Sequence, residues 1–234
     1  MIMSLPRNIE PEWLDTLAPD DPGAIGSRRD LRVLNGFMMQ RRTMAQLLER
    51  HGPPKVRTIL ELGAGDGTFM MHVAQRLAKR WPKVTVTLLD QQNLVGEETR
   101  RDFQAIGWEV RTEAADVFEY LDTPGLAGVD IVSANLFLHH FTQEQLSRMF
   151  RQVARIAPLF VACEPRRNSL SLLSSRMVWM LGCNSVTRHD APASVRAGFN
   201  GRELSTLWPE HAGWSLHEHA AGLFTHCYTA RDDG

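Results

Sequence analysis

The sequence predicts an α/β fold, with a parallel sheet covered by helices on both faces. Short apolar runs alternate with helical patterns along most of the chain, and this alternation is typical of parallel strands joined through helices. One run, at 59–62, leads directly into a glycine-rich turn, and a helical pattern follows from Thr68. A strand, a glycine turn and a helix in this order form the first unit of a nucleotide-binding α/β domain.

The composition is that of an ordinary globular protein, and it excludes several classes. The 234 residues suit one or two domains, with 43% hydrophobic and 23% charged residues. The net charge of −1 gives no broad electrostatic case for a nucleic-acid partner. The three cysteines are far apart, so we expect neither a disulfide framework nor a metal site, and a cytoplasmic location. No signal peptide or membrane span is expected.

Residues 1–54 are predicted to be an N-terminal arm and a helical cap. The first 23 residues are rich in Pro, Asp and Glu, which favours a mostly irregular arm. Apolar residues then recur near helical spacing over 24–51. The sequence Gly52-Pro53-Pro54 ends that helix.

Residues 55–234 are predicted to form the α/β domain itself. Its expected strands are 58–62, 84–90, 108–114, 129–134 and 159–163, and its expected helices are 68–79, 95–106 and 143–156. The alternation stops at about 165–200, which holds a serine-rich helical stretch and a polar loop at 184–191. A short helix at 201–208 precedes two segments of strand-like alternation, 214–219 and 223–231, which predict a closing hairpin.

The glycine turn itself indicates the kind of ligand. Its glycines, Gly63, Gly65 and Gly67, let the backbone turn sharply and approach a ligand with no Cβ in the way. A dinucleotide-binding turn would usually place its third glycine where this chain has Thr68. A phosphate-binding P-loop would need a Gly-Lys-Ser/Thr ending, which is absent. The run Glu61–Gly67 resembles instead the first motif of the class I S-adenosylmethionine-dependent methyltransferases.

This resemblance covers about residues 56–165 and again the final hairpin. It implies a Rossmann-like seven-stranded sheet, with helices on both faces and an antiparallel last strand inserted beside the fifth. The segment 223–231 suits that last strand. The resemblance also implies an enzyme with S-adenosylmethionine as its cofactor, and a lid over the acceptor formed by about 165–200.

The resemblance further implies roles for individual residues. Glu61 would hold the ammonium group of the cofactor's methionine part, often through water, and Asp90 would accept both ribose hydroxyls. Asp116 would face the adenine amino group, and Val117 would pack on the ring. From the residues alone, Asp90 and Asp116 could equally cap the helices that follow them. The expected cofactor-binding residues all follow strand ends, and they are Glu61, Gly63, Ala64, Gly65, Gly67, Asp90, Gln91, Asp116, Val117, Asn135 and Leu136.

A histidine pair, His139 and His140, follows the fourth predicted strand. A pair at this place resembles the small-molecule branch of the family, which includes ubiquinone-type, menaquinone-type and natural-product methyltransferases. Transfer to a phenol or an activated carbon requires the loss of one proton, and histidine titrates near neutrality. Either histidine is therefore a candidate base, although one could instead pack or cap the 143–156 helix. Cys163 is a less favoured alternative nucleophile, because it reads as a buried core residue.

The predicted function is methyl transfer to an oxygen or activated carbon of a small aromatic, quinone-like or polyketide acceptor. The apolar residues of 165–200, among them Leu172, Met177 and Trp179, could cover a flat or lipidic acceptor or could pack as an ordinary helix. Two alternatives remain at this point: an N-methyltransferase acting on a small amine or a protein side chain, and a non-catalytic binding protein of the same fold. Beyond the small-molecule acceptor no partner is predicted, and the oligomeric state is not determined.

Overall fold

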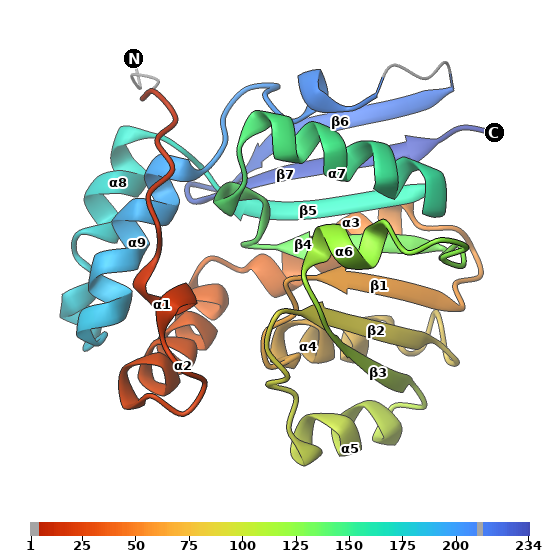
Figure 1. Cartoon of the computed structure of the whole chain (residues 1–234), viewed down its shortest axis with the longest axis horizontal. Helices are drawn as coiled ribbons and strands as arrows, with labels where there is room; N and C mark the ends of the chain where they lie inside the picture. The colour runs from red at the N-terminus through yellow and green to blue at the C-terminus, as the bar shows by residue number, and fades with distance from the viewer. Residues whose placement is uncertain (1–4, 210–212) are drawn as a thin grey trace.

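The computed structural model describes residues 5–209 and 213–234, and these residues form one seven-stranded sheet with helices on both faces (Figure 1). The strands, in the order β3-β2-β1-β4-β5-β7-β6, are β1 (Thr58–Leu62), β2 (Thr85–Asp90), β3 (Glu109–Ala114), β4 (Ile131–Asn135), β5 (Leu159–Pro165), β6 (Trp214–Ala221) and β7 (Thr225–Asp232). The first five strands pair in parallel, whereas β7 runs antiparallel to both β5 and β6. The predicted Rossmann-like sheet with an antiparallel last strand beside the fifth is therefore confirmed.

Two hydrophobic cores, one on each face of the sheet, hold the helices in place. The helices of one face are α3 (Gln40–His51), α4 (Thr68–Leu77) and α5 (Glu97–Ala105), and those of the other are α6 (Val117–Leu121) and α7 (Gln143–Ile156). Alternate residues of a strand point to opposite faces. In β1, Ile59 accordingly packs in the first core, whereas Leu60 and Leu62 pack in the second.

A separate group of helices lies beyond one edge of the sheet, at the left of Figure 1. Its members are α1 (Trp13–Thr16), α2 (Pro22–Phe37), α8 (Ser169–Ser175), the 3₁₀ helix η2 (Val178–Leu181) and α9 (Ser185–Ala197). The N-terminal arm and the 165–200 segment thus lie side by side over the carboxyl ends of the central strands. None of the described helices combines the length and the apolar character that crossing a bilayer requires.

Several predicted elements differ from the structure in their bounds or their kind. The helix expected over 24–51 is interrupted at Met39, whose φ of 55° is left-handed, so that α2 ends and α3 begins there. The loop expected at 184–191 is wrong, because α9 begins there, with the Asn184 side chain accepting a hydrogen bond from the Thr187 backbone. The helix expected at 201–208 is only a 3₁₀ turn, η3 (Ser205–Leu207). The separation into domains at residue 54 stays a prediction.

An aromatic cluster in the second core depends on Phe150 of α7, which is fully buried. Its ring centroid lies 5.2 Å from that of Trp208, 5.6 Å from that of Phe160 and 5.7 Å from that of Tyr228. We expect Phe150→Ala to lower the free energy of unfolding by about 3–5 kcal/mol, because it leaves a cavity among three rings. Urea denaturation would measure the loss, with the exposed neighbour Arg151→Ala as a control that changes it little. A loss no larger than that of the control would contradict this role.

Candidate active site

Three cavities meet at the carboxyl ends of the strands, and Leu136 borders all of them. The turn cavity, of about 120 Å³, lies beside the glycine turn. The strand-end cavity, of about 310 Å³, lies between the end of β2 and the 3₁₀ helix η1 (Leu138–His140). The apolar cavity, of about 430 Å³, lies between α2, α8, η2 and α9. Leu136 has a left-handed φ of 51°, a strained conformation for a leucine that concentrates at functional sites.

The glycine turn shapes the turn cavity through its backbone. A Cβ on Gly63 would lie 2.2 Å from the ring of Phe137, and the φ of 67° is itself left-handed. Gly63, Ala64 and Gly65 border the turn cavity, and their contact with the cofactor stays a prediction. Gly67 does not border the turn cavity. It is the N-cap residue of α4, and a Cβ there would lie 2.7 Å from the Leu88 side chain.

Three buried oxygens of the turn cavity lack a hydrogen-bond partner. They are Oε2 of Glu61, Oδ1 of Asn35 and Oδ1 of Asn135. Burial, together with the charges of Asp66 and Asp90, raises the pKa of Glu61 well above its ordinary value. Buried acceptors of this kind are normally satisfied, and an ammonium group offers three N–H donors. The residues present therefore fit the methionine ammonium group that the sequence led us to expect beside Glu61.

Two arginines of α2 bring positive charge to the same place. Arg28 borders both the turn cavity and the strand-end cavity, and Arg32 borders the turn cavity. The Arg32 Nε atom lies 3.8 Å from a carboxylate oxygen of Asp66. Because guanidinium groups bind carboxylates well, these two residues are placed to receive the carboxylate of an amino acid whose ammonium group faces Glu61.

Asp90 connects the end of β2 to the glycine turn. Its two carboxylate oxygens accept hydrogen bonds from the backbone nitrogens of Gly65, at 2.9 Å, and Gln92, at 3.0 Å. The residue also borders the strand-end cavity, as do Gln91 and Val117. Each carboxylate oxygen has a second lone pair, so the two bonds leave acceptors for ribose hydroxyls.

Asp116 occupies the helix-capping position that the sequence left open. One of its carboxylate oxygens accepts hydrogen bonds from the backbone nitrogens of Phe118, at 2.8 Å, and Glu119, at 3.2 Å, at the start of α6. Its neighbours Ala115 and Val117 border the strand-end cavity, but Asp116 itself does not. A contact between Asp116 and adenine stays a prediction.

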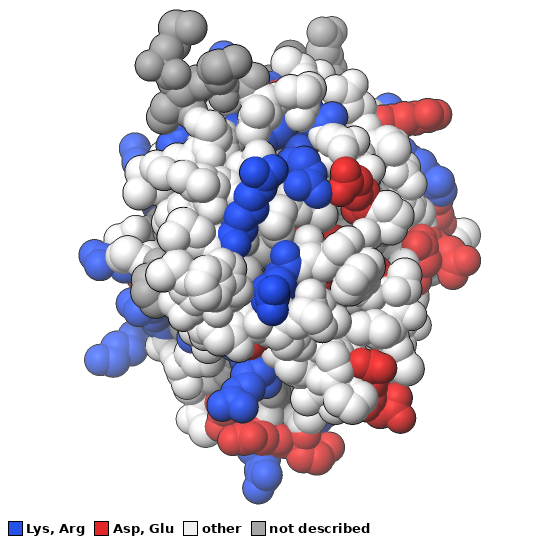
Figure 2. All heavy atoms as spheres, turned by 90° about the vertical axis from the view of Figure 1, so that its left-hand side faces the viewer, with Lys and Arg blue, Asp and Glu red and all other residues white. Residues whose placement is uncertain are grey.

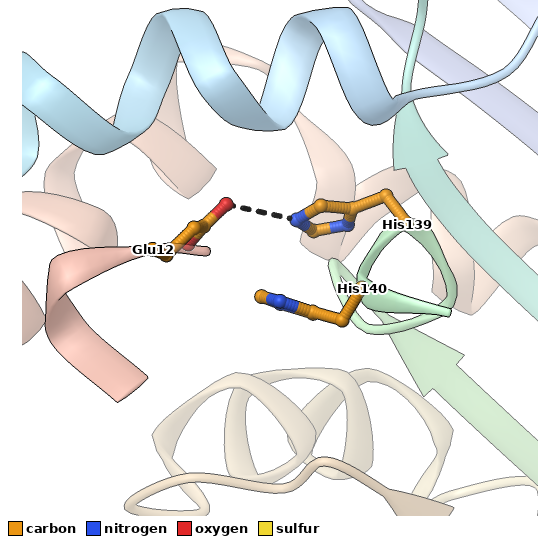
Figure 3. Close-up of side chains that lie close together, drawn as sticks. All are labelled: Glu12, His139 and His140. Carbon is orange, nitrogen blue, oxygen red and sulfur yellow. Dashed lines mark hydrogen bonds and ion pairs between the residues drawn. The ribbon is translucent and has the colours of Figure 1, made fainter. Parts of the chain in front are cut away.

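A buried chain of ionisable groups begins at Glu164, the penultimate residue of β5. One carboxylate oxygen of Glu164 accepts hydrogen bonds from the backbone nitrogens of Phe137 and Leu138, at 3.0 and 2.8 Å. The other oxygen is 2.8 Å from Nδ1 of His139. On the far side of the ring, Nε2 of His139 lies 3.2 Å from Oε1 of Glu12 (Figure 3). The imidazole of His139 is therefore held between two carboxylates.

These contacts shift the pKa values of His139 and Glu12. Burial alone would lower the pKa of His139, but the hydrogen bonds and charges of Glu12 and Glu164 outweigh it and raise the pKa to about 10. Burial would likewise raise the pKa of Glu12, but its contacts with His139 lower it to about 2. Its place between two carboxylates therefore favours the protonated imidazole, in which both ring nitrogens donate. Nothing in the sequence pattern indicated Glu12, which lies in an acid-rich arm 127 residues away from its partner His139.

His140 lies beside His139 but in a more open position. The two ring centroids are 4.2 Å apart, and Nδ1 of His140 is 3.2 Å from a carboxylate oxygen of Asp15. His140 is a quarter exposed and borders the strand-end cavity, together with Glu12. A carboxylate that fixes one ring nitrogen leaves the other free to accept a proton, which is how a histidine is prepared as a general base.

Two further chemistries can be judged from the same geometry. Glu12, His139 and His140 each offer a ligand atom, and these atoms lie within 4.8 Å of one another, so the group could hold a metal ion. An ion bound there would have to replace the hydrogen bond between Glu12 and His139.

Cys163, the alternative nucleophile, is fully buried, and its Sγ lies 4.0 Å from that of Cys227. The contact with Cys227 and burial raise its pKa, as expected for an unreactive core thiol.

Glu61 provides a test of the cofactor geometry through pH. In the unliganded protein its raised pKa favours the neutral acid, whereas an ammonium group favours the carboxylate. We therefore expect the affinity for S-adenosylhomocysteine to rise with pH, from the ordinary pKa of glutamate up to the raised one, with release of a proton on binding. Calorimetry in buffers of different ionisation enthalpy would measure both. Glu61→Gln should weaken binding at least about tenfold and abolish the pH dependence; a variant that kept either property would contradict the assignment.

Comparison with known proteins identifies the kind of domain. Residues 59–157 match the family model of a methyltransferase domain. No curated protein sequence matches the chain. The match runs from β1 to the residue after α7, and it therefore includes the glycine turn and the histidine pair.

Solved structures share the fold at low sequence identity. An O-methyltransferase family protein from Burkholderia thailandensis is 16% identical with a TM-score of 0.57, over 91% of this chain and 62% of that one. A protein assigned as an O-methyltransferase from Nostoc punctiforme is 18% identical with a TM-score of 0.58, over 97% and 64%. A magnesium protoporphyrin IX methyltransferase from Synechocystis with bound S-adenosylhomocysteine is 16% identical with a TM-score of 0.51, over 87% and 85%.

The chain spans less than two thirds of the length of the first two of these proteins, and at such identities the likeness shows the fold alone. The matched domain and the strand order nevertheless agree with each other. Residues 59–157 match a methyltransferase domain, whose cofactor is S-adenosylmethionine, and the sheet has the Rossmann-like fold of the solved methyltransferases.

Proposed function

We propose that the protein transfers a methyl group to an oxygen or activated carbon of a small aromatic, quinone-like or polyketide acceptor. The observation that carries this proposal is the apolar cavity, which meets both cofactor-side cavities at Leu136. Its walls are mostly aliphatic and methionine side chains, among them Leu34, Met38 and Val178. A flat, apolar acceptor suits such walls, since ligand sites are commonly apolar with a few placed polar groups. S-adenosylmethionine supplies the electrophilic methyl group when it is bound.

Only a few polar side chains border the apolar cavity. They are Glu12, His139 and four serines, Ser171, Ser174, Ser175 and Ser194. Glu12 also borders the strand-end cavity, so it marks the boundary between the proposed acceptor and cofactor sites. A hydroxyl of the acceptor near this boundary would have a carboxylate to bind, which supports an oxygen or phenol-activated carbon as the accepting atom.

The two histidines have different proposed roles. His140 is the proposed general base, because its Nδ1 lies 3.2 Å from a carboxylate oxygen of Asp15 and it borders the strand-end cavity. The accepting atom would then lie at the boundary of the two cavities that Glu12 marks. His139 is the proposed positioning residue, because both its nitrogens are bound and it connects Glu12 to Glu164. The names of two structural neighbours, both O-methyltransferases, support transfer to oxygen for this chain.

One observation favours a second candidate, an N-methyltransferase acting on a small amine. Glu12 is held ionised at the border of the apolar cavity, and a carboxylate there would also attract a protonated amine. The small-molecule acceptor, the absence of a nucleic-acid partner and a cytoplasmic location remain predictions of the sequence.

A panel of acceptors separates these candidates. The purified chain with S-adenosylmethionine would be offered phenols, hydroxyquinones and aromatic polyketides in one set, and small amines in another. We expect a mass increase of one methylene group in the first set, located on oxygen or ring carbon by fragmentation. Products from amines alone would favour the second candidate. No product from either set, together with normal S-adenosylhomocysteine binding, would indicate a binding protein of this fold.

His140→Gln tests the proposed base. We expect kcat on a phenolic acceptor to fall by a factor of about 10²–10⁴, because glutamine cannot accept the proton of the acceptor hydroxyl. The dissociation constant of S-adenosylhomocysteine should change far less. His217→Gln on β6, an exposed histidine away from the cavities, is the matched control and should retain full turnover. Equal turnover in the two variants would remove His140 from the mechanism.

A further inference from the structure

Among the residues that the structure describes, half of the large apolar side chains that are exposed to solvent lie on the short segment 169–181. Twelve such side chains are exposed, and six of them belong to α8, η2 and the turn between these helices. We call these six residues the lid face: Leu170, Leu173, Met177, Trp179, Met180 and Leu181. Trp179 is 58% exposed and Met180 61%. Contiguous exposed apolar surface of this kind marks an interaction site, whereas scattered single residues need no explanation.

The lid face is continuous with the apolar cavity. Met177, Met180 and Leu181 are more than two fifths exposed, and yet they also border that cavity. The cavity is therefore separated from the outside by a single layer of side chains. On its opposite wall, α2 contributes Leu34, and the nearby Val33 is again exposed. A molecule that covers the lid face would lie directly against the entrance to the proposed acceptor site.

The exposed charged side chains of the segment that contains the lid face are arginines, although Asp30 of α2 accepts hydrogen bonds from Asn184 and Thr187 at the start of α9. Residues 165–189 contain four arginines and neither aspartate nor glutamate. Of these arginines, Arg176 and Arg188 are exposed, next to the apolar residues of α8 and at α9. Figure 2 looks onto this side of the molecule: Lys and Arg lie across its left half and centre and also at the right edge and the bottom, whereas Asp and Glu gather only at the right and the bottom. The partner of the lid face should therefore be apolar and negatively charged.

An anionic bilayer meets both conditions better than a second copy of the chain. A twofold interface places the same patch on both partners, so Arg176 would approach the like charges of the copy with no acidic residue of the segment between them. Lipid phosphates bind arginine well, and basic residues are attracted to anionic leaflets. Exposed tryptophan is enriched at the bilayer interface. Because no described helix can cross a membrane, the contact would be with its surface.

We propose that the lid face docks onto an anionic membrane surface and that a lipid-soluble acceptor enters the apolar cavity from the bilayer. The second half of this statement rests on the proposed function, whereas the docking itself does not. Vesicle binding needs no methyl transfer, so its outcome is independent of whether the acceptor panel gives a product.

The experiment is flotation of the purified chain with vesicles. One set contains phosphatidylcholine with phosphatidylglycerol, and the other contains phosphatidylcholine alone. We expect binding to the anionic vesicles, weaker binding to the neutral ones, and a decrease at about 0.5 M salt, because screening shortens the reach of the arginine charges. Tryptophan fluorescence should be quenched by brominated acyl chains more strongly in the anionic vesicles than in the neutral ones.

Two variants locate the contact. Leu173→Ser with Trp179→Ser should lower the vesicle partition coefficient at least about tenfold, because two exposed apolar side chains no longer enter the interface. Neither residue borders the apolar cavity. Arg176→Gln should lower partitioning about fivefold, and the matched control Arg155→Gln, an exposed arginine at the other end of the molecule on α7, should not. Unchanged S-adenosylhomocysteine binding would show that each variant is folded.

Three results would overturn the proposal. The first is absence of binding to the anionic vesicles by the folded protein. The second is equal partitioning of the double variant and the wild type. The third is a dimer in sedimentation velocity that the double variant dissociates, which would assign the lid face to a second copy of the chain.

Discussion

The buried carboxylate of Glu164 is the group on which the arrangement of the site depends. It holds the start of η1 through the backbone nitrogens of Phe137 and Leu138, and it binds His139. His139 in turn binds Glu12, so a single chain of charge connects β5, η1 and the N-terminal arm. A buried carboxylate is costly unless it is fully bonded. Each of these elements therefore has to be in place for the others to be stable.

This chain of charge also explains how three cavities come to share one border. Glu164 fixes the residues that follow β4, and the left-handed backbone of Leu136 brings that segment between the cavities. The turn cavity and the strand-end cavity have more polar walls than the apolar cavity and lie on the side of the glycine turn, where orphaned oxygens suit an ammonium group. The apolar cavity lies on the side of the lid. A polar cofactor beside the glycine turn and an apolar acceptor in the apolar cavity would therefore each lie in surroundings of matching polarity, with Leu136 between them.

The fold was predictable because its signals are local. The apolar run of β1, the glycines after it and the helical pattern of α4 are adjacent in the chain, and their order is sufficient to indicate a strand, a turn and a helix. Predictions failed where a single residue decided the outcome. Met39 adopts a left-handed conformation that its side chain does not favour, and Asn184 starts a helix in a segment that read as a polar loop. Asn184 is also bound to α2, because its backbone nitrogen donates to Asp30 and its side-chain nitrogen to the Gly23 carbonyl.

The sequence by itself determined which residues gather at the carboxyl ends of the central strands, since Glu61, Gly63 and Asp90 stand at strand ends that a parallel sheet must bring together. It could not determine the acceptor side. The distinction between His139 and His140 comes from Glu12, Asp15 and Glu164, which approach from distant parts of the chain. Which nitrogen is free, and which apolar residues remain exposed, are properties of contacts between segments. Such contacts exist only once the arm and the lid have packed over the sheet.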